Sequence, residues 1–301
     1  MVRVTTAAPE PTRASHWLDS ATDSDVTPYP ARVPTAAIDV YIAAFVARCE
    51  PMRRSGRAMI DRPGVRGLLA SSDDPRIRLL VTDDRAYDVL SALLADARAG
   101  MVNVVARAAR CTELVDADPA WKPNQAMAMI CRDLRTVPAL ALPTGLTLRP
   151  VRRLAGDAAD GVALQDAVTS AMLGDGTIDD PPAVFAGYLR SLPSAMRLFV
   201  AVDGDGVVRA TSGSGAFGAE ASVIFVNTQP DWRGRGIGQA MTVAALRAAQ
   251  EHGARRACLD ASAAGLSIYR RLGFETVSST TRFFRGRPTA VPGSSTSPAT
   301  R

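Results

Sequence analysis

The residues best suited to chemistry lie in one short segment, Gln229–Gln239, which reads QPDWRGRGIGQ. Its glycines alternate along the chain: Gly234, Gly236 and Gly238. Without Cβ atoms in the way, successive peptide N–H groups can point into one concave site for an anion. A helix that begins there adds the positive end of its dipole, and Arg233 and Arg235 add formal charge. The segment therefore predicts a site for an anion such as a pyrophosphate.

Two common phosphate-binding motifs do not fit this segment. The dinucleotide fingerprint G-x-G-x-x-G would need a glycine where the chain has Gln239. The Walker loop needs a Gly-Lys-Ser/Thr sequence, and the only lysine in the chain is Lys122. The anion site must therefore belong to another class of protein.

Several other kinds of site lack the residue types that they need. The chain has two histidines, His16 and His252, and four cysteines that lie far apart: Cys49, Cys111, Cys131 and Cys258. Because there is no C-x-x-C pair, we expect no zinc or other metal site and no Cys–His nucleophile, but four reduced, mostly buried thiols. The scarcity of histidine also disfavours a Ser-His-Asp triad.

A second segment, Ala261–Glu275 (ASAAGLSIYRRLGFE), completes a resemblance to the GNAT acetyltransferase superfamily. The glycine-rich segment matches the acyl-CoA signature Arg/Gln-x-x-Gly-x-Gly/Ala, and the second is similar to Asn-x-x-Ala-x-x-Leu-Tyr-x-x-Leu-Gly-Phe. Four positions fall in register: Tyr269, Leu272, Gly273 and Phe274. Three depart from the pattern: Ser262 replaces Asn, Gly265 replaces Ala and Ile268 replaces Leu. The resemblance covers about residues 146–287.

The resemblance implies acetyl-CoA as co-substrate and direct attack by an acceptor amine. Main-chain groups of Phe225, Val226, Asn227 and Thr228 would pair with the pantetheine amides, as an added strand would. The turn would hold the pyrophosphate: Arg233, Gly234, Arg235, Gly236, Ile237 and Gly238. Tyr269 would donate a proton to the departing thiolate. Ser262 is either a cofactor contact or the N-cap of a helix that starts at Ala263.

The general base and the acceptor are less well marked. Family members often use a Glu on the strand before the glycine-rich turn, but that position corresponds to Ser222. Glu220, two residues earlier, points to the same face of the strand and is our candidate base, with Asp260 as its rival. Three carboxylates on one loop could attract a cationic amine: Asp175, Asp179 and Asp180.

The elements that must position these residues describe an α/β domain after Pro143 and Gly145. Apolar patterns predict strands at 146–151, 197–202, 206–214, 221–228, 257–260 and 274–284. Helices are predicted at 156–172, 182–192, 236–252 and 263–272. A hairpin turn is expected at 203–206, and Gly253 should end the third of these helices. The order β–α–α–β–β–β–α–β–α–β agrees with a GNAT-like acyl-CoA N-acyltransferase fold.

The first half predicts a smaller α/β domain that carries no chemical motif. We expect a helix at 36–49, strands at 77–81 and 101–105, a helix from Asp84 that stops before Gly100, and a strand or short helix at 126–131. These elements permit a degenerate second GNAT copy. The predicted division is a disordered lead (1–35), an N-terminal domain (36–140), the acetyltransferase domain (146–287) and a disordered tail (288–301). On this division, residues 141–290 contain the whole cofactor site.

Composition limits the remaining function classes. The chain has 301 residues, a net charge of +5 and no long apolar run, so we expect no membrane span. Its basic residues are not concentrated in a stripe, which disfavours nucleic-acid binding. The first thirty residues lack the apolar core of a secretory signal, so we expect a cytoplasmic protein. The alternatives to an enzyme are a non-catalytic CoA-binding sensor and an interaction protein on the same scaffold. The oligomeric state stays open.

Overall fold

The computed structural model describes residues 37–54, 56–70, 76–96, 99–153, 161–164, 166–167, 186, 189–190 and 192–285. One mixed sheet of twelve strands runs through these residues, in the order β1-β2-β3-β4-β12-β5-β11-β10-β9-β8-β6-β7. The predicted fold class, a mixed α/β sheet, is confirmed. The predicted lead, the tail and the loop with Asp175, Asp179 and Asp180 lie outside the described residues.

The N-terminal half contributes one long helix followed by strands and short helices. In chain order these are α2 (Ala37–Arg54), β1 (Met59–Arg62), β2 (Val65–Leu68), β3 (Arg76–Val81), α3 (Tyr87–Asp96), β4 (Ala99–Val105), α4 (Ala109–Asp116) and β5 (Lys122–Cys131). The β1–β2 hairpin was not predicted, because its strands are short and rich in arginine. Its turn depends on Gly64, which has φ 82°. Helix α4 was not predicted either, and β5, predicted as a strand or a short helix at 126–131, is a strand that begins earlier, at Lys122. The remaining elements of this half were predicted to within about five residues.

The C-terminal half follows an exposed linker at residues 138–146. It contains β6 (Thr147–Arg152), β7 (Val162–Ala163), β8 (Met196–Val202), β9 (Val208–Phe217), β10 (Glu220–Thr228), α7 (Ile237–Glu251), β11 (Arg256–Ala261), α8 (Leu266–Arg271) and β12 (Glu275–Arg285). Two predictions were wrong. Val162 and Ala163, expected in a helix, form a strand parallel to β6, and α8 begins at Leu266 rather than Ala263.

The two halves repeat one folding pattern. In each, two parallel neighbouring strands are joined through a helix: β3 and β4 through α3, and β10 and β11 through α7. In each, a second helix then leads to a long strand, β5 or β12. This order is the same in both halves, so the N-terminal half is a second copy of the core of the C-terminal fold. No sequence motif had indicated the repeat.

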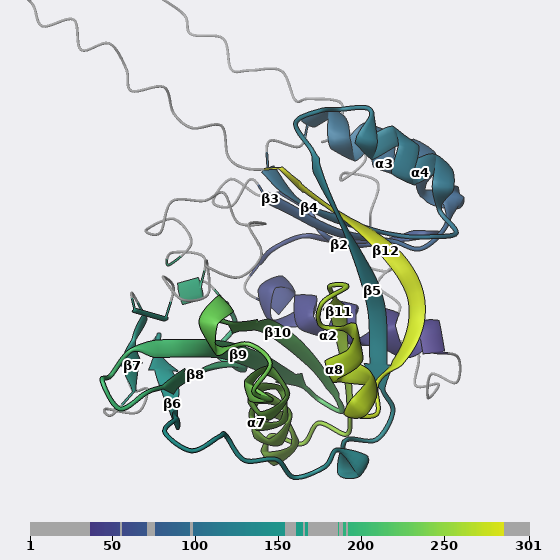
Figure 1. Ribbon diagram of the computed structural model, residues 1–301. Coiled ribbons are helices and arrows are strands. Elements are labelled where there is room, and N and C mark those ends of the chain that lie inside the picture. Colours follow the sequence, from purple (N-terminus) through teal and green to yellow (C-terminus); the bar gives the residue numbers. More distant parts are fainter. Residues whose placement is uncertain are drawn as a thin grey trace, which may run out of the picture.

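The long strands β5 and β12 are exchanged between the halves. Residues 127–131 of β5 pair with β11 of the C-terminal half, whereas residues 280–285 of β12 pair with β4 of the N-terminal half. Between these ends, β5 and β12 pair with each other over nearly their whole length. Figure 1 shows them as two long curved strands that run side by side from one half to the other. Each half therefore depends on a strand of the other.

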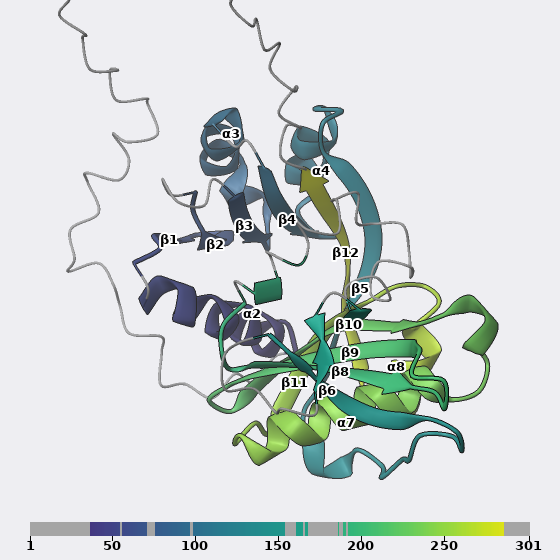
Figure 2. The same cartoon turned by 90° about the vertical axis from the view of Figure 1, so that its left-hand side faces the viewer.

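Helices cover both faces of the sheet. Helices α3 and α4 pack on strands of the N-terminal half, and α7 and α8 pack on strands of the C-terminal half. Helix α2 lies on the opposite face, between the two halves (Figure 2). Its apolar side chains pack against β2 and β3 on one side and against β5 and β11 on the other. Helix α2 thereby contacts the strands that carry the predicted site.

Candidate functional site

The site lies where β10 and β11 separate. The two parallel strands pair over only three residues, from Glu220↔Arg256 to Ser222↔Cys258. Strand β10 nevertheless continues to Thr228, still paired with β9 on its other side. The edge of β10 that faces β11 is therefore without a strand partner beyond Ser222. Such an edge offers main-chain donors and acceptors to an extended ligand.

A bulge distorts this open edge. The register of β10 against β9 shifts between Ile224 and Asn227, which places Phe225 and Val226 in the bulge. Phe225 has φ 52°, the only positive φ of a non-glycine residue in the described part of the chain. Thr211 holds this conformation, because its Oγ1 donates a 2.8 Å hydrogen bond to the Phe225 carbonyl. Asn227 and Thr228 resume the pairing with β9.

The glycine-rich turn joins β10 to α7 in the predicted place. Gly234 and Gly236 both have φ 77°, and Gly236 is the N-cap of α7. A Cβ atom added at either position would meet no heavy atom within 4 Å, so the space above the turn is open. Ile237, the first residue of α7, is buried in the core and anchors the helix there. Backbone conformation, and not packing, requires glycine at 234 and 236.

The turn presents N–H groups and two guanidinium groups. Within the described residues, the N–H groups of Gly234, Arg235 and Gly236 donate no hydrogen bond, and the first helical N–H groups of α7 have no intrahelical acceptor. Arg233 Nε donates to the Thr228 carbonyl at 3.0 Å. The Arg235 guanidinium lies 4.9 Å from the centre of the Trp232 ring. Free donors and positive charge are the features that suit a turn to an anion.

Helix α8 forms the opposite side of this opening. A Cβ atom at Gly238 would lie 3.5 Å from Ile268 Cδ1 and 3.6 Å from Thr228 Oγ1. The start of α7, the end of β10 and the middle of α8 therefore meet at one point. Ser262 is exposed, and its Oγ accepts a 3.3 Å hydrogen bond from the Gly265 N–H. It closes the turn before α8 and is not the residue that caps the helix, which is Gly265.

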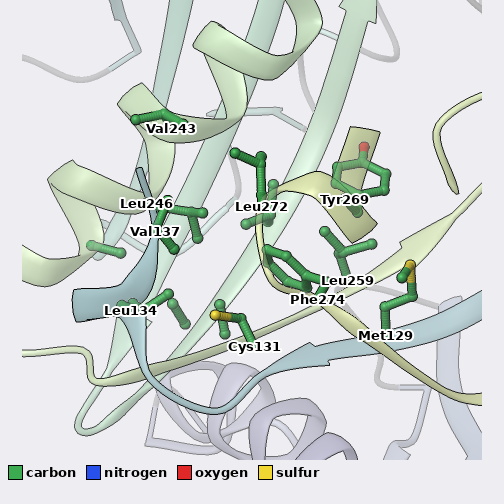
Figure 3. Close-up of a cluster of buried hydrophobic side chains, with 14 of the residues drawn as sticks. Met129, Cys131, Leu134, Val137, Val243, Leu246, Leu259, Tyr269, Leu272 and Phe274 are labelled. Carbon is green, nitrogen blue, oxygen red and sulfur yellow. The ribbon is translucent and has the colours of Figure 1, made fainter. Parts of the chain in front are cut away.

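Tyr269 occupies the inner face of α8. Its side chain is 8% exposed and packs with Phe274, whose ring centre is 6.0 Å away in an edge-on arrangement. In Figure 3 the hydroxyl oxygen points away from the labelled apolar side chains. The hydroxyl makes no hydrogen bond to any described residue. Burial raises the pKa of Tyr269 to about 12, so the phenol stays protonated and can act as a donor.

Two carboxylates lie on the face of the strands that α2 covers. Glu220 is 7% exposed; one of its oxygens accepts a hydrogen bond from Arg256, and the other is buried without a partner. Burial raises the pKa of Glu220 although Arg256 opposes the shift. Asp260, on β11, is partly exposed and accepts a 2.7 Å hydrogen bond from Tyr41 Oη of α2. The structure brings both candidate bases to the same face.

Two residues of this face were missed in the sequence. Tyr41 and Arg48 both come from α2, and Arg48 Nη1 donates a 3.1 Å hydrogen bond to Ser222 Oγ. The helix was predicted, but its docking site on the other half was not. No local pattern could have found these residues, because 219 positions separate Tyr41 from Asp260.

The corresponding place in the N-terminal half is closed. Strands β3 and β4 pair along all six residues from Arg76↔Ala99 to Val81↔Val104, so no edge opens between them. The turn after β3 carries Asp83 and Asp84 where the other half has glycines. A hydrogen bond from Arg85 lowers the pKa of Asp83 to about 2, and this ion pair leaves the Arg85 guanidinium already matched by a carboxylate. The repeat has kept the fold without the cleft.

Other kinds of site find no support in the described residues. They contain no group of three or more metal-ligating side chains and no helix long and apolar enough to cross a bilayer. All four cysteines are free and buried, as predicted. Burial raises the pKa of Cys258 to about 12, which keeps this thiol protonated and unreactive.

Comparison with known proteins agrees with this geometry. The family model described as acetyltransferase (GNAT) domain matches residues 194–276, a range that contains β8 to α8 and thus the whole cleft. A search of the curated proteins found no match.

Solved structures match over most of the chain. A GCN5-related N-acetyltransferase from Kribbella flavida has a TM-score of 0.52 and 20% identity, with 84% of this chain and 96% of that chain covered. Another, from Sphaerobacter thermophilus, has a TM-score of 0.51 and 17% identity, with 86% and 97% covered. At these identities the likeness shows a shared fold, and it extends into the N-terminal half.

Proposed function

Since the chain belongs to the GNAT superfamily through its C-terminal half, we propose that it is an N-acetyltransferase that moves an acetyl group from acetyl-CoA to an amine. The observation that carries this proposal is the open edge of β10, which leads from Ser222 to a turn with free N–H groups. The strand edge would pair with the amides of the pantetheine arm, and the turn would bind the pyrophosphate, so the two features together suit CoA.

The residues of the cleft fit acetyl-CoA. Main-chain groups of residues 225–228 would pair with the pantetheine amides, and the bulge at Phe225 turns these groups out of the regular ladder. The N–H groups of residues 234–238 would hold the pyrophosphate, and the side chains of Arg233 and Arg235 would add charge. Ser262 Oγ already accepts a hydrogen bond from the Gly265 N–H, and we assign this side chain a local structural role.

The acceptor amine would attack the acetyl carbonyl directly, so the protein needs no nucleophile. Tyr269 would donate a hydrogen bond to the thiolate as it departs. Because the hydroxyl has no described partner and its ring is fixed by packing, it is available for this contact without breaking another. A fixed donor costs no reorganisation at the moment of reaction.

A base must take the proton from the attacking amine. We propose Glu220, since its raised pKa makes it a better proton acceptor than an exposed carboxylate and one oxygen has no partner. Asp260 is the rival on the same face, closer to solvent. Water would have to link a buried Glu220 to the amine.

The proposal is tested by offering acetyl-CoA and a library of amines to the purified protein and measuring release of free CoA thiol. We expect turnover with at least one class of primary amine. Binding of CoA without turnover for any amine would favour a non-catalytic CoA sensor, a reading that the Glu220–Arg256 ion pair supports. Failure to bind CoA would contradict both.

Replacing Gly236 with Val should weaken CoA binding at least tenfold, or by about 1.4 kcal/mol. The new side chain would fill the open space above the turn, where the pyrophosphate must approach the backbone. Isothermal calorimetry with CoA measures the effect.

Gly253→Val is the matched control, because strain alone could also destabilise the variant. Gly253 follows the other end of α7, has φ 93° and would likewise place its Cβ in open space. Both variants should lose a similar roughly 1–3 kcal/mol of stability to strain. Only Gly236→Val should lose CoA affinity; equal losses would remove the turn from the site.

Glu220→Gln should lower kcat at least tenfold at neutral pH. A base works only when deprotonated, so the activity of the native protein should fall as the pH drops through its pKa. Because that pKa is raised, this fall should begin above the ordinary glutamate range near pH 4.5. A pH–rate profile checks this, with Asp260→Asn as the matched variant. If only Asp260→Asn removes the acid limb, the base is Asp260.

A further inference from the structure

Helix α2 brings a cation to the point where β10 and β11 separate. Ser222 and Cys258 form the last paired position of the two strands, and their side chains face α2. The Arg48 guanidinium reaches this point from α2 and donates to Ser222 Oγ at 3.1 Å. The N-terminal half therefore places a positive charge at the base of the cleft of the other half.

Arg48 forms no ion pair with a described residue, although Asp260 lies near enough to interact with its charge. Apart from Ser222, its guanidinium contacts only the face of the Phe45 ring, 5.1 Å from the ring centre. No carboxylate of a described residue lies within 4 Å of it, whereas the neighbouring Glu220 is already paired with Arg256. A guanidinium carries five N–H donors in a planar fork, so most of the hydrogen-bonding capacity of Arg48 is unused. The side chain of Arg48 is partly exposed.

A negative group lies on the same face, on the other strand. Asp260 is two residues beyond Cys258 on β11, and only its Oδ1 has a partner, the Tyr41 hydroxyl of α2. Its second carboxylate oxygen accepts no hydrogen bond from a described residue, and the side chain is partly exposed. Opposite charges with unused hydrogen-bonding capacity thus flank the base of the cleft, one on each side.

We propose that this pair binds the acceptor and that the acceptor is a small amine that also carries a carboxylate. Arg48 binds the carboxylate through its free N–H groups, and Asp260 binds the ammonium form of the amine before the proton is lost. Tyr41 fixes the orientation of Asp260. This inference rests on the proposed acetyltransferase function and names the class of its second substrate.

A carboxylate fits this place better than a phosphate. A phosphate monoester carries close to two negative charges, and both Asp260 and the buried Glu220 would repel it. A carboxylate carries one, which Arg48 alone can match in a two-pronged contact. Arg48 contacts Ser222 on β10, and Asp260 lies on the neighbouring strand two residues beyond the partner of Ser222. Adjacent strands are about 4.8 Å apart, and two residues advance about 6.6 Å along a strand. The two groups therefore suit a molecule of amino-acid size.

The test measures binding as well as turnover. Calorimetry on the CoA-saturated full-length protein compares the common L-amino acids, and the ω-amino acids from β-alanine to 5-aminopentanoate, with their carboxamides. At least one free acid should bind tenfold or more tighter than its carboxamide. Arg48→Gln should remove that preference by weakening the acid at least tenfold, with little effect on the carboxamide. Arg53→Gln, on the same helix but exposed and paired with Glu50, should leave it unchanged.

The outcomes separate this inference from the proposed function. If amines are acetylated but no acid is preferred over its carboxamide, or if Arg48→Gln leaves the preference intact, Arg48 is not an acceptor site. If 2-aminoethyl phosphate binds more tightly than every carboxylate, the anion is a phosphate and the proposal is wrong. If Arg48→Gln lowers the melting temperature and CoA affinity together, Arg48 only docks α2. Loss of CoA binding in the native protein would instead contradict the proposed function itself.

Discussion

Replacing Tyr269 with Phe should lower kcat roughly 100-fold, with KM for acetyl-CoA nearly unchanged. The substitution keeps the ring that packs against Phe274 and removes only the hydroxyl. That hydroxyl has no described hydrogen-bond partner whose loss could disturb the fold. The effect should therefore appear in the chemical step, where the departing thiolate gains charge, and not in ground-state binding.

The raised pKa of Tyr269 limits the role that this residue could have in the proposed reaction. A thiol has a pKa near 8.5, and burial raises the pKa of the phenol to about 12. The pKa of Tyr269 thus lies more than three units above that of the thiol, so complete proton transfer from Tyr269 to the thiolate is unfavourable. A hydrogen bond to the developing charge is still favourable, and a buried donor is worth more there than in water. We expect stabilisation by a retained proton, with the thiolate protonated later by solvent.

Tyr87→Phe provides the matched control for this prediction. Tyr87 begins α3 in the N-terminal half and packs partly buried against its core. Its replacement should leave kcat unchanged. Stopped-flow or steady-state thiol release gives kcat, and a melting curve reports packing. A Tyr269→Phe variant with near-native kcat would exclude the tyrosine from the mechanism, and one that loses stability and CoA affinity together would make it a packing residue.

The geometry of the proposed cofactor side could be predicted because its determinants are local. The strand, turn and helix from Glu220 to Glu251 are consecutive, and Gly234 and Gly236 have the positive φ that their residue type suggests. Residues that are close in the sequence of this segment are therefore also close in the folded structure. The same holds for Gly253 after α7 and for Tyr269 on α8.

The proposed acceptor side could not be predicted because it is assembled from distant parts. Arg48 meets Ser222 across 174 positions of sequence, through a helix that packs between the halves. An amphipathic pattern marks the face of a helix that will be buried but not the surface that buries it. The exchange of β5 and β12 is hidden for a related reason. Alternation of apolar residues predicts a strand and its buried face, whereas the choice of neighbour depends on the whole sheet.

The exchanged strands change what a C-terminal fragment should do. Residues 141–290 hold every residue proposed to bind the cofactor, yet we expect this fragment not to fold by itself. It lacks β5, so β11 keeps only its three-residue pairing with β10, and β12 loses both of its neighbours. The core under α7 and α8 loses four buried side chains: Met129, Cys131, Leu134 and Val137. At about 2–4 kcal/mol for each large apolar side chain, this loss is comparable with the roughly 5–15 kcal/mol that stabilise a typical domain.

A cut without loss of residues is the control for this last prediction. A protease site placed after Ala141, in the exposed linker, would break the chain while both pieces stay present. The cut protein should remain folded and bind CoA, since β5 keeps its place between β11 and β12. The isolated fragment should show no cooperative melting and no CoA binding by calorimetry. If the fragment instead melts cooperatively and binds CoA with native affinity, the C-terminal half is an independent domain and the exchanged strand is dispensable.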